Sequence, residues 1–272
     1  MVLLLVAGCG GSPAAAPPTS TSAAATHESS VMSTLPPVSA TMTAIVPTTT
    51  TTTPPPARGQ VVVLDPGHNG GNATHPDEIN RPVPAGRGKT KPCNTTGTAT
   101  NGGYPEHAFT WDVALRVRDL LAARGVQVVM TRQDDTGVGP CVDQRAAIGN
   151  QSGAAAVVSI HADGSTDPSA HGFHVAYSSP PLNDAQGEPS TRLSTTIRDA
   201  MVSGGFATST YIGSAGLSPR NDLGGLNLSE RPAVLVECGN MRNATEAAAF
   251  GSPNGRQSYA AAIANGILLY LG

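Results

Sequence analysis

Three short apolar runs, each followed by a side chain that can do acid–base or metal chemistry, constrain the fold of this chain more than any other feature. The runs start near residues 61, 155 and 233, and they lead to His68, His161 and Glu237. Continuous runs of β-branched residues are typical of strands buried on both faces, as in parallel sheets. Because ligands bind at the carboxyl ends of such strands, we expect the three side chains to meet in one crevice.

Helical patterns between these runs predict a single α/β domain over residues 58–272. The clearest helix is expected to begin at Pro105 and to end at Gly125, and it carries an apolar stripe at helical spacing. Further helices are expected over 142–151, 189–202, 244–250 and 259–271, further strands over 126–130 and 172–177, and a polar loop over 217–228. The alternation favours a mostly parallel, twisted central sheet of about six strands with helices on both faces.

The first 57 residues are expected to lie outside that domain. Residues 1–9 form a short apolar run that ends at Cys9 and resembles the end of a bacterial lipoprotein signal, although no Lys or Arg precedes it. Residues 10–57 are rich in Ala, Ser, Thr and Pro, a composition that cannot bury enough apolar surface to fold. We therefore expect an exported protein of the cell envelope, either anchored through a lipid on Cys9 and a disordered tether, or secreted.

The placement of the cysteines predicts one disulfide. Besides Cys9 the chain has Cys93, Cys141 and Cys238, and an odd number of thiols in an exported chain implies one pair and one free cysteine. Cys93 and Cys141 lie in segments rich in Gly and Pro, whereas Cys238 ends an apolar run, so we expect the first two to pair. The bond would fix the long segment 69–105 as a wall or lid of the crevice. The alternative is that all three thiols stay reduced.

The residues near the strand ends form a set of metal ligands. Glu106 opens its helix on the apolar side, so its carboxylate should point to the sheet, whereas His107 is rotated by about 100° and is the weaker candidate. His68, Glu106 and His161 supply three ligands, which is the pattern of a catalytic zinc site with an open fourth position. Glu237 would then act as the general base on a water made acidic by one Zn²⁺. The alternatives are a solvated turn at His68 and a helix-dipole partner at Glu106.

Six motifs occur in one order along the chain. They are Leu64-Asp-Pro-Gly-His68-Asn-Gly-Gly71, Glu106 at its helix start, Thr131-Arg132 with Arg145, Ser159-Ile-His161-Ala-Asp163, Arg220-Asn-Asp-Leu223-Gly-Gly-Leu226, and Arg231-Pro-Ala-Val-Leu-Val-Glu237-Cys-Gly-Asn240. With these motifs the chain from Gln60 onward resembles the zinc-dependent N-acetylmuramoyl-L-alanine amidases, and among them the mycobacterial cell-wall enzymes. The resemblance implies the same three zinc ligands, a catalytic Glu237, and cleavage of the amide between muramic acid and L-alanine of peptidoglycan.

Four further residues are candidates for contacts around the site. Asp65, just before the Pro-Gly turn, is expected to orient His68. Arg132 and Arg220 are expected either to bind carboxylates of the peptide stem or to form structural ion pairs. Asn240, at the end of the last strand, belongs to the same group. Two other histidines, at positions 171 and 174, are interpreted as ordinary strand residues because neither stands at the end of a run.

Two other functions share this pattern. A peptidoglycan-binding lipoprotein without catalysis would use the crevice but not Glu237, and a zinc carboxypeptidase or deacetylase on the same polymer would differ only in the bond that it cleaves. A net charge of −3, with 13% charged residues and no basic cluster, excludes nucleic acid as a partner. We expect a monomer that acts on peptidoglycan or its muropeptide fragments.

Overall fold

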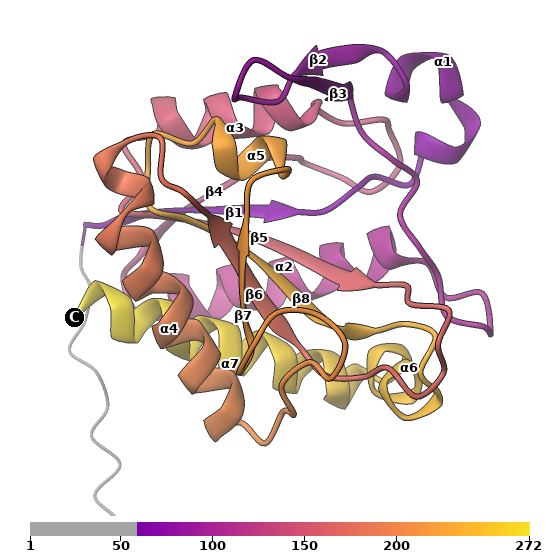
Figure 1. The fold of residues 1–272 in the computed structure, drawn as a ribbon. Helices are drawn as coiled ribbons and strands as arrows, with labels where there is room; N and C mark the ends of the chain where they lie inside the picture. The colour runs from indigo at the N-terminus through magenta and orange to yellow at the C-terminus, as the bar shows by residue number, and fades with distance from the viewer. Residues whose placement is uncertain (1–58) are drawn as a thin grey trace, which may run out of the picture. The chain divides into compact units, whose positions relative to one another are not determined.

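The computed structural model describes residues 59–272 (Figure 1). The signal segment expected over residues 1–9, with Cys9, and the tether expected over 10–57 lie outside the described residues. Among the helices of the described part, none is long and apolar enough to cross a membrane.

A six-stranded sheet in the order β4-β1-β5-β8-β6-β7 lies at the centre of this part of the chain (Figure 1). Its strands are β1 (Val61–Pro66), β4 (Gln127–Met130), β5 (Ala156–Asp163), β6 (His174–Ser178), β7 (Leu217–Arg220) and β8 (Ala233–Asn240). The first four in the sheet are parallel, β6 runs antiparallel to β8, and β7 is parallel to β6. The mostly parallel sheet expected from the sequence is thus confirmed.

Helices cover both faces of the sheet, as predicted, but unequally. On one face lie α2 (Glu106–Ala122), α4 (Glu188–Ser203) and α7 (Pro253–Leu271), and on the other lie α3 (Val142–Gln151) and the four-residue α5 (Gly224–Asn227) (Figure 1). A further helix, α6 (Ala244–Gly251), follows β8. The main core is on the first face, where its strand residues include Val62, Leu64, Val158, Ile160, Val234 and Val236. The second face has a smaller core, which leaves room for a cavity.

The alternation of side chains along each strand decides which residues reach that second face. Successive side chains of a strand point to opposite faces, so residues two apart share one face. Because the even-numbered residues of β1, β5 and β8 fill the main core, Asp65, Ser159, His161 and Glu237 face the thinly covered side. Each of these four residues therefore has access to the space under α3 and α5.

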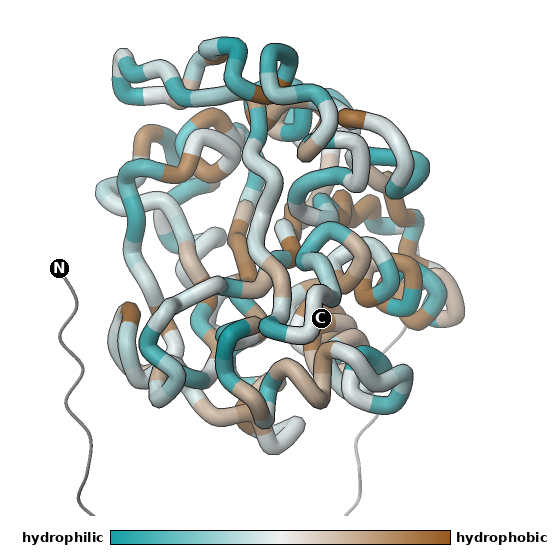
Figure 2. The backbone as a smooth tube through the Cα atoms, turned by 90° about the vertical axis from the view of Figure 1, so that its right-hand side faces the viewer, coloured by the Kyte–Doolittle hydropathy of each residue, from teal (hydrophilic) through white to brown (hydrophobic). Residues whose placement is uncertain are grey.

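The segment 69–105 has short elements of its own. It contains α1 (Pro76–Ile79) and a hairpin in which β2 (Pro82–Pro84) pairs antiparallel with β3 (Thr90–Pro92). The chain here is drawn mostly in hydrophilic and neutral colours (Figure 2). A disulfide between Cys93 and Cys141 joins the end of β3 to the start of α3, whereas Cys238 is free and buried. The predicted pairing is confirmed, and the bond fixes this segment beside the second face.

Two predicted boundaries are wrong. The polar loop expected over 217–228 contains β7 and α5; β7 holds Pro219, which a strand tolerates at the edge of a sheet because one side of its backbone needs no partner. The last helix begins at Pro253 rather than 259, because Pro is well suited to the first turn and the Ser252 side chain accepts a hydrogen bond from the Gly255 amide.

Replacing both Cys93 and Cys141 by Ser is expected to lower the free energy of unfolding by about 3 to 4 kcal/mol, because the bond restrains a loop of the unfolded chain whose ends are 48 residues apart. Urea unfolding of the wild type and the double variant measures the difference. A thiol reductant should lower the wild-type midpoint to that of the variant and leave the variant unchanged. Equal midpoints in oxidised wild type and variant would contradict the prediction.

Candidate active site

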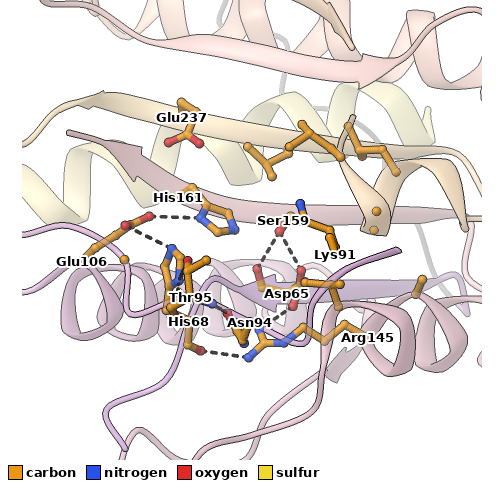
Figure 3. A pocket seen from close by; sticks show the side chains of 18 of the residues that line it. Asp65, His68, Lys91, Asn94, Thr95, Glu106, Arg145, Ser159, His161 and Glu237 are labelled. Atoms are coloured by element: carbon orange, nitrogen blue, oxygen red, sulfur yellow. Dashed lines mark hydrogen bonds and ion pairs between the residues drawn. The ribbon is translucent and has the colours of Figure 1, made fainter. Parts of the chain in front are cut away.

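His68, Glu106 and His161, the three ligands expected from the sequence, come together at the carboxyl ends of β1 and β5 (Figure 3). One ligand atom of each lies within 4.8 Å of the other two. The carboxylate of Glu106 stands between the rings, with Oε2 3.1 Å from His68 Nε2 and Oε1 3.0 Å from His161 Nδ1. This cluster could hold a metal ion.

A tight turn after β1 brings His68 into the cluster. The preceding Gly67 has no space for a side chain, because a Cβ there would lie 2.2 Å from the ring of His161. His68 itself has a positive φ of 60°. Its Nδ1 lies 3.0 Å from the carbonyl oxygen of Thr95, so the ring donates a hydrogen bond to the backbone there and directs Nε2 toward Glu106.

Glu106 is an ionised carboxylate in a buried position. It is the first residue of α2 and only 3% exposed. Its Oε2 accepts a hydrogen bond from the Thr98 amide at 2.9 Å, and its Oε1 accepts one from the Ala162 amide at 3.1 Å. Burial alone would raise the pKa of Glu106, but the charges of His68 and His161 and their hydrogen bonds hold it well below its usual value. An anionic carboxylate oxygen of Glu106 therefore lies beside each of the two imidazoles.

The donor set fits a divalent metal of the zinc type. Two imidazoles and one carboxylate are ligands that Zn²⁺ takes at catalytic sites, where three protein ligands leave one position open. The competing residue, His107, is outside the cluster, since its Nδ1 is bound to Asp135 Oδ2 at 2.8 Å. The side of the helix stripe on which a residue lies therefore separated the two candidates correctly.

Glu237 lies next to this cluster on the adjacent strand. It is paired with His161 in the register of β5 and β8, and its carboxylate points toward that residue (Figure 3). Its Oε2 is buried and has no hydrogen-bond partner among the described residues. Burial and the nearby charges of Asp163 and Glu106 raise the pKa of Glu237 well above its usual value. A buried carboxyl group without a partner is costly, and such groups are concentrated at functional sites.

A cavity of 390 Å³ extends from the cluster over the second face of the sheet. His68, Glu106, His161 and Glu237 line one end, and the cavity continues past Ser159 beneath the segment that includes Lys91 (Figure 3). We call this cavity, from the ligand cluster to the side chains between α3 and α5, the groove. It offers space for an extended ligand beside the candidate metal site.

Comparison with known proteins now identifies the family. Residues 62–268 match the family described as N-acetylmuramoyl-L-alanine amidase. The chain belongs to this amidase family. An N-acetylmuramoyl-L-alanine amidase of Mycobacterium tuberculosis is 48% identical over 213 residues, which cover 78% of this chain and 87% of that protein. A germination-specific N-acetylmuramoyl-L-alanine amidase of Bacillus subtilis is 27% identical over 230 residues, which cover 78% of this chain and 80% of that protein.

Solved structures of two mycobacterial amidases resemble this chain in sequence and in fold. The crystal structure of the amidase Ami1 from Mycobacterium smegmatis has 54% sequence identity and a TM-score of 0.77, and the match covers 79% of this chain and 98% of that one. The crystal structure of apo Ami1 from Mycobacterium abscessus has 54% sequence identity and a TM-score of 0.76, and the match covers 79% of this chain and 100% of that one. The chain is thus an amidase that hydrolyses peptidoglycan. A disulfide persists in oxidising compartments, which fits an enzyme that meets this polymer outside the cytoplasm.

In this amidase Asp65 reaches His68 through Arg145. The carboxylate of Asp65 accepts hydrogen bonds from Thr131 Oγ1 at 2.6 Å, Ser159 Oγ at 2.7 Å and Arg145 at 2.8 Å. Arg145 also donates to the main-chain carbonyl of His68 at 2.9 Å. Burial opposes ionisation, but Arg145 and the two hydroxyl groups lower the pKa of Asp65 to about 2. The pair therefore supports the backbone of the His68 turn rather than the imidazole.

The other three candidates contact protein groups. Arg132 is 2% exposed and forms an ion pair with Asp135 at 2.9 Å. Its guanidinium is therefore bound to protein groups and buried away from a substrate. Arg220 ends β7 and pairs with Asp222 at 2.6 Å in a half-buried position. Asn240 is fully buried, and its side-chain amide donates to the carbonyl of Ala170 at 2.9 Å. The structural ion pairing that was the alternative for the two arginines is thus present at both Arg132 and Arg220.

Sequence reasoning missed His174. It is the first residue of β6, not an interior one, and the antiparallel pairing with β8 sets it opposite Glu237. Its Nδ1 is buried without a hydrogen-bond partner in the described part of the chain and lies 3.8 Å from Asp163 Oδ2. Burial and the charge of Arg220 lower the pKa of His174 to about 4, so the ring is neutral. The sequence has no signal for the reversed direction of β6, which creates this neighbourhood.

Asp65→Asn is expected to lower the free energy of unfolding at neutral pH by about 2 kcal/mol, because the pKa falls from 3.8 to about 2 on folding. A carboxyl group with a lowered pKa stabilises the fold above its unfolded pKa. The difference between wild type and variant should therefore persist above about pH 4 and shrink as the pH falls toward 2. Urea unfolding across this range measures it. Asp77→Asn, at an exposed aspartate of α1, is the control, and an equal effect of both changes would exclude the buried pair as the cause.

Proposed function

We propose that this amidase uses one zinc ion, held by His68, Glu106 and His161, to cleave the amide between N-acetylmuramic acid and L-alanine in peptidoglycan. The observation that carries the proposal is the convergence of two imidazoles on one ionised, buried carboxylate. Glu237, with a carboxylate oxygen that has no partner among the described residues, stands beside them. A site that only binds peptidoglycan would have no use for such a group.

The residues of the chain divide the chemistry among them. A zinc ion held by His68, Glu106 and His161 would supply Lewis acidity toward the scissile carbonyl and would lower the pKa of a bound water. Glu237 accepts a proton from the attacking water and returns it to the leaving nitrogen. The carbon–nitrogen bond then breaks to give the lactyl carboxylate of the sugar and the free amine of L-alanine. The Thr95 carbonyl and the Thr98 amide hold His68 and Glu106 in place.

We further propose that Cys9 carries a lipid and that residues 10–57 tether the catalytic part to the membrane. The lipoprotein-like ending of residues 1–9 and the Pro- and Thr-rich composition that follows support this arrangement. A tether would let the amidase reach peptidoglycan at a limited distance from its anchor. The catalytic part is proposed to act as a monomer.

Glu237→Gln is expected to retain zinc and to lose activity by about a hundredfold to ten-thousandfold, because the amide keeps the size of the side chain but cannot accept the proton. The assay is digestion of purified muropeptides followed by mass spectrometry. The wild type should release stems that begin with L-alanine, whereas shortened stems would indicate a carboxypeptidase and loss of acetyl groups a deacetylase.

The matched control for this experiment is Glu230→Gln, at an exposed glutamate ahead of β8, which should behave as the wild type. Metal content is measured on the same preparations. A Glu237→Gln enzyme that holds zinc and still releases stems at the wild-type rate would remove the general base from the proposal.

His161→Gln is expected to weaken zinc binding by at least about a hundredfold, since even changes in groups that merely support ligands cost tenfold to a hundredfold. Titration with zinc after removal of metal by a chelator measures the affinity. His171→Gln, at an exposed histidine outside the cluster, should bind zinc as the wild type does. Equal zinc affinities in the two variants would show that the cluster is not the zinc site.

A further inference from the structure

We propose that the amine of Lys91 binds a carboxylate of the peptide stem, on the second residue after the scissile bond. The inference rests on the proposed function, because it assumes that the amide to L-alanine lies at the ligand cluster. It assigns to the hairpin of β2 and β3 the recognition of a charge on the substrate. The structure supports it through the direction of the groove, the position of Lys91 and the chemistry of the stem.

The groove runs along two parallel strands away from the ligand cluster. On β5 the residues that line it include His161, Ser159 and Val157, and on β8 they include Glu237, Leu235 and Ala233. These residues are two apart, so each step along the floor is about 7 Å, the same as two residues of an extended peptide. An extended stem that leaves the cluster would therefore bring its second residue to the level of Ser159 and Leu235.

Lys91 lies over this part of the floor. It belongs to β3, is half-buried, and extends its side chain into the groove (Figure 3). Its alkyl chain crosses to α5, where a Cβ on Gly224 would stand only 3.2 Å from Lys91 Cδ. Within the described part of the chain Lys91 has no ion pair or hydrogen bond. Together with Arg220, the charge of Lys91 lowers the pKa of Asp222 without a direct ion pair, so the amine keeps its hydrogen-bonding capacity for an anionic group of a ligand in the groove.

A second donor on the same wall is also unused. The side-chain nitrogen of Asn94 is buried and has no hydrogen-bond partner among the described residues, while its oxygen accepts a hydrogen bond from the Thr95 amide at 2.8 Å. Asn94 lines the groove and is 6% exposed. Buried donors are normally satisfied, so a wall with one unpaired amide donor and one ammonium group that makes no direct bond fits a ligand that supplies the acceptors.

The chemistry of the substrate decides which part of it enters the groove. The glycan continues on both sides of each muramic acid, so it needs an open surface, whereas the peptide stem is a branch that can enter beneath the hairpin. The second residue of a stem is a glutamate joined to the third through its side chain, which leaves its α-carboxyl group as a free carboxylate or a carboxamide. Lys91 would distinguish these two forms, because a charged acceptor binds an ammonium group more strongly than a neutral one.

The test uses two muramyl tripeptides that differ only in this α-carboxylate or α-carboxamide. Wild-type enzyme loaded with zinc is expected to have the higher kcat/KM for the carboxylate. Lys91→Met, which keeps the length of the side chain, should lower kcat/KM for the carboxylate by about tenfold to a hundredfold, mainly through KM, and leave the carboxamide nearly unchanged. Lys91→Arg keeps the charge and should retain most of the preference.

Lys89→Met, at an exposed lysine of the same hairpin, should match the wild type on both substrates. If Lys91→Met cleaves both tripeptides with the wild-type ratio, or loses both equally, the carboxylate subsite is refuted while hydrolysis stands. A wild type without preference refutes it as well. If the wild type releases no stem from either substrate, the proposed function fails first and the subsite falls with it.

Discussion

The burial of one carboxylate between two imidazoles is the interaction on which the site depends. An isolated ionised carboxylate in such a place would be strongly unfavourable, and removal of a single partner from a buried pair typically costs about 3 to 5 kcal/mol. Glu106 avoids this cost because His68 and His161 flank it and two backbone amides donate to it. These contacts fix the end of β1, the end of β5 and the start of α2 relative to one another, before any ion binds.

The unequal covering of the sheet turns this local arrangement into an active site. The long helices α2, α4 and α7 bury the even-numbered side chains of the central strands and provide most of the core. Their odd-numbered neighbours face α3 and α5, where the covering is short and the groove opens. Stability and chemistry are therefore assigned to opposite faces of the same strands. The disulfide supports this division, because it secures the wall of the groove without adding bulk to its floor.

Much of the fold, and the clustering of His68, Glu106 and His161, could be predicted because the signals were local. Apolar runs identified the strands that lead to His68, His161 and Glu237, and the stripe of α2 separated Glu106 from His107. The features that could not be predicted depend on which strands, far apart in the sequence, pair with each other and in which direction. The reversed direction of β6 puts a buried histidine opposite Glu237, yet periodicity is the same for either direction of a strand. Short elements such as β2, β3 and β7 are stabilised by tertiary contacts and leave little pattern in the sequence.

Gly67 shows how closely His68 and His161 are packed together. The space that any larger residue would need at this position is already filled by the ring of His161, which approaches from a different strand. A residue with no reactive group thus sets how closely the ends of β1 and β5 can approach each other. A larger residue at position 67 would have to displace the His161 ring or the turn that carries His68, so this position should tolerate change as little as the two histidines do.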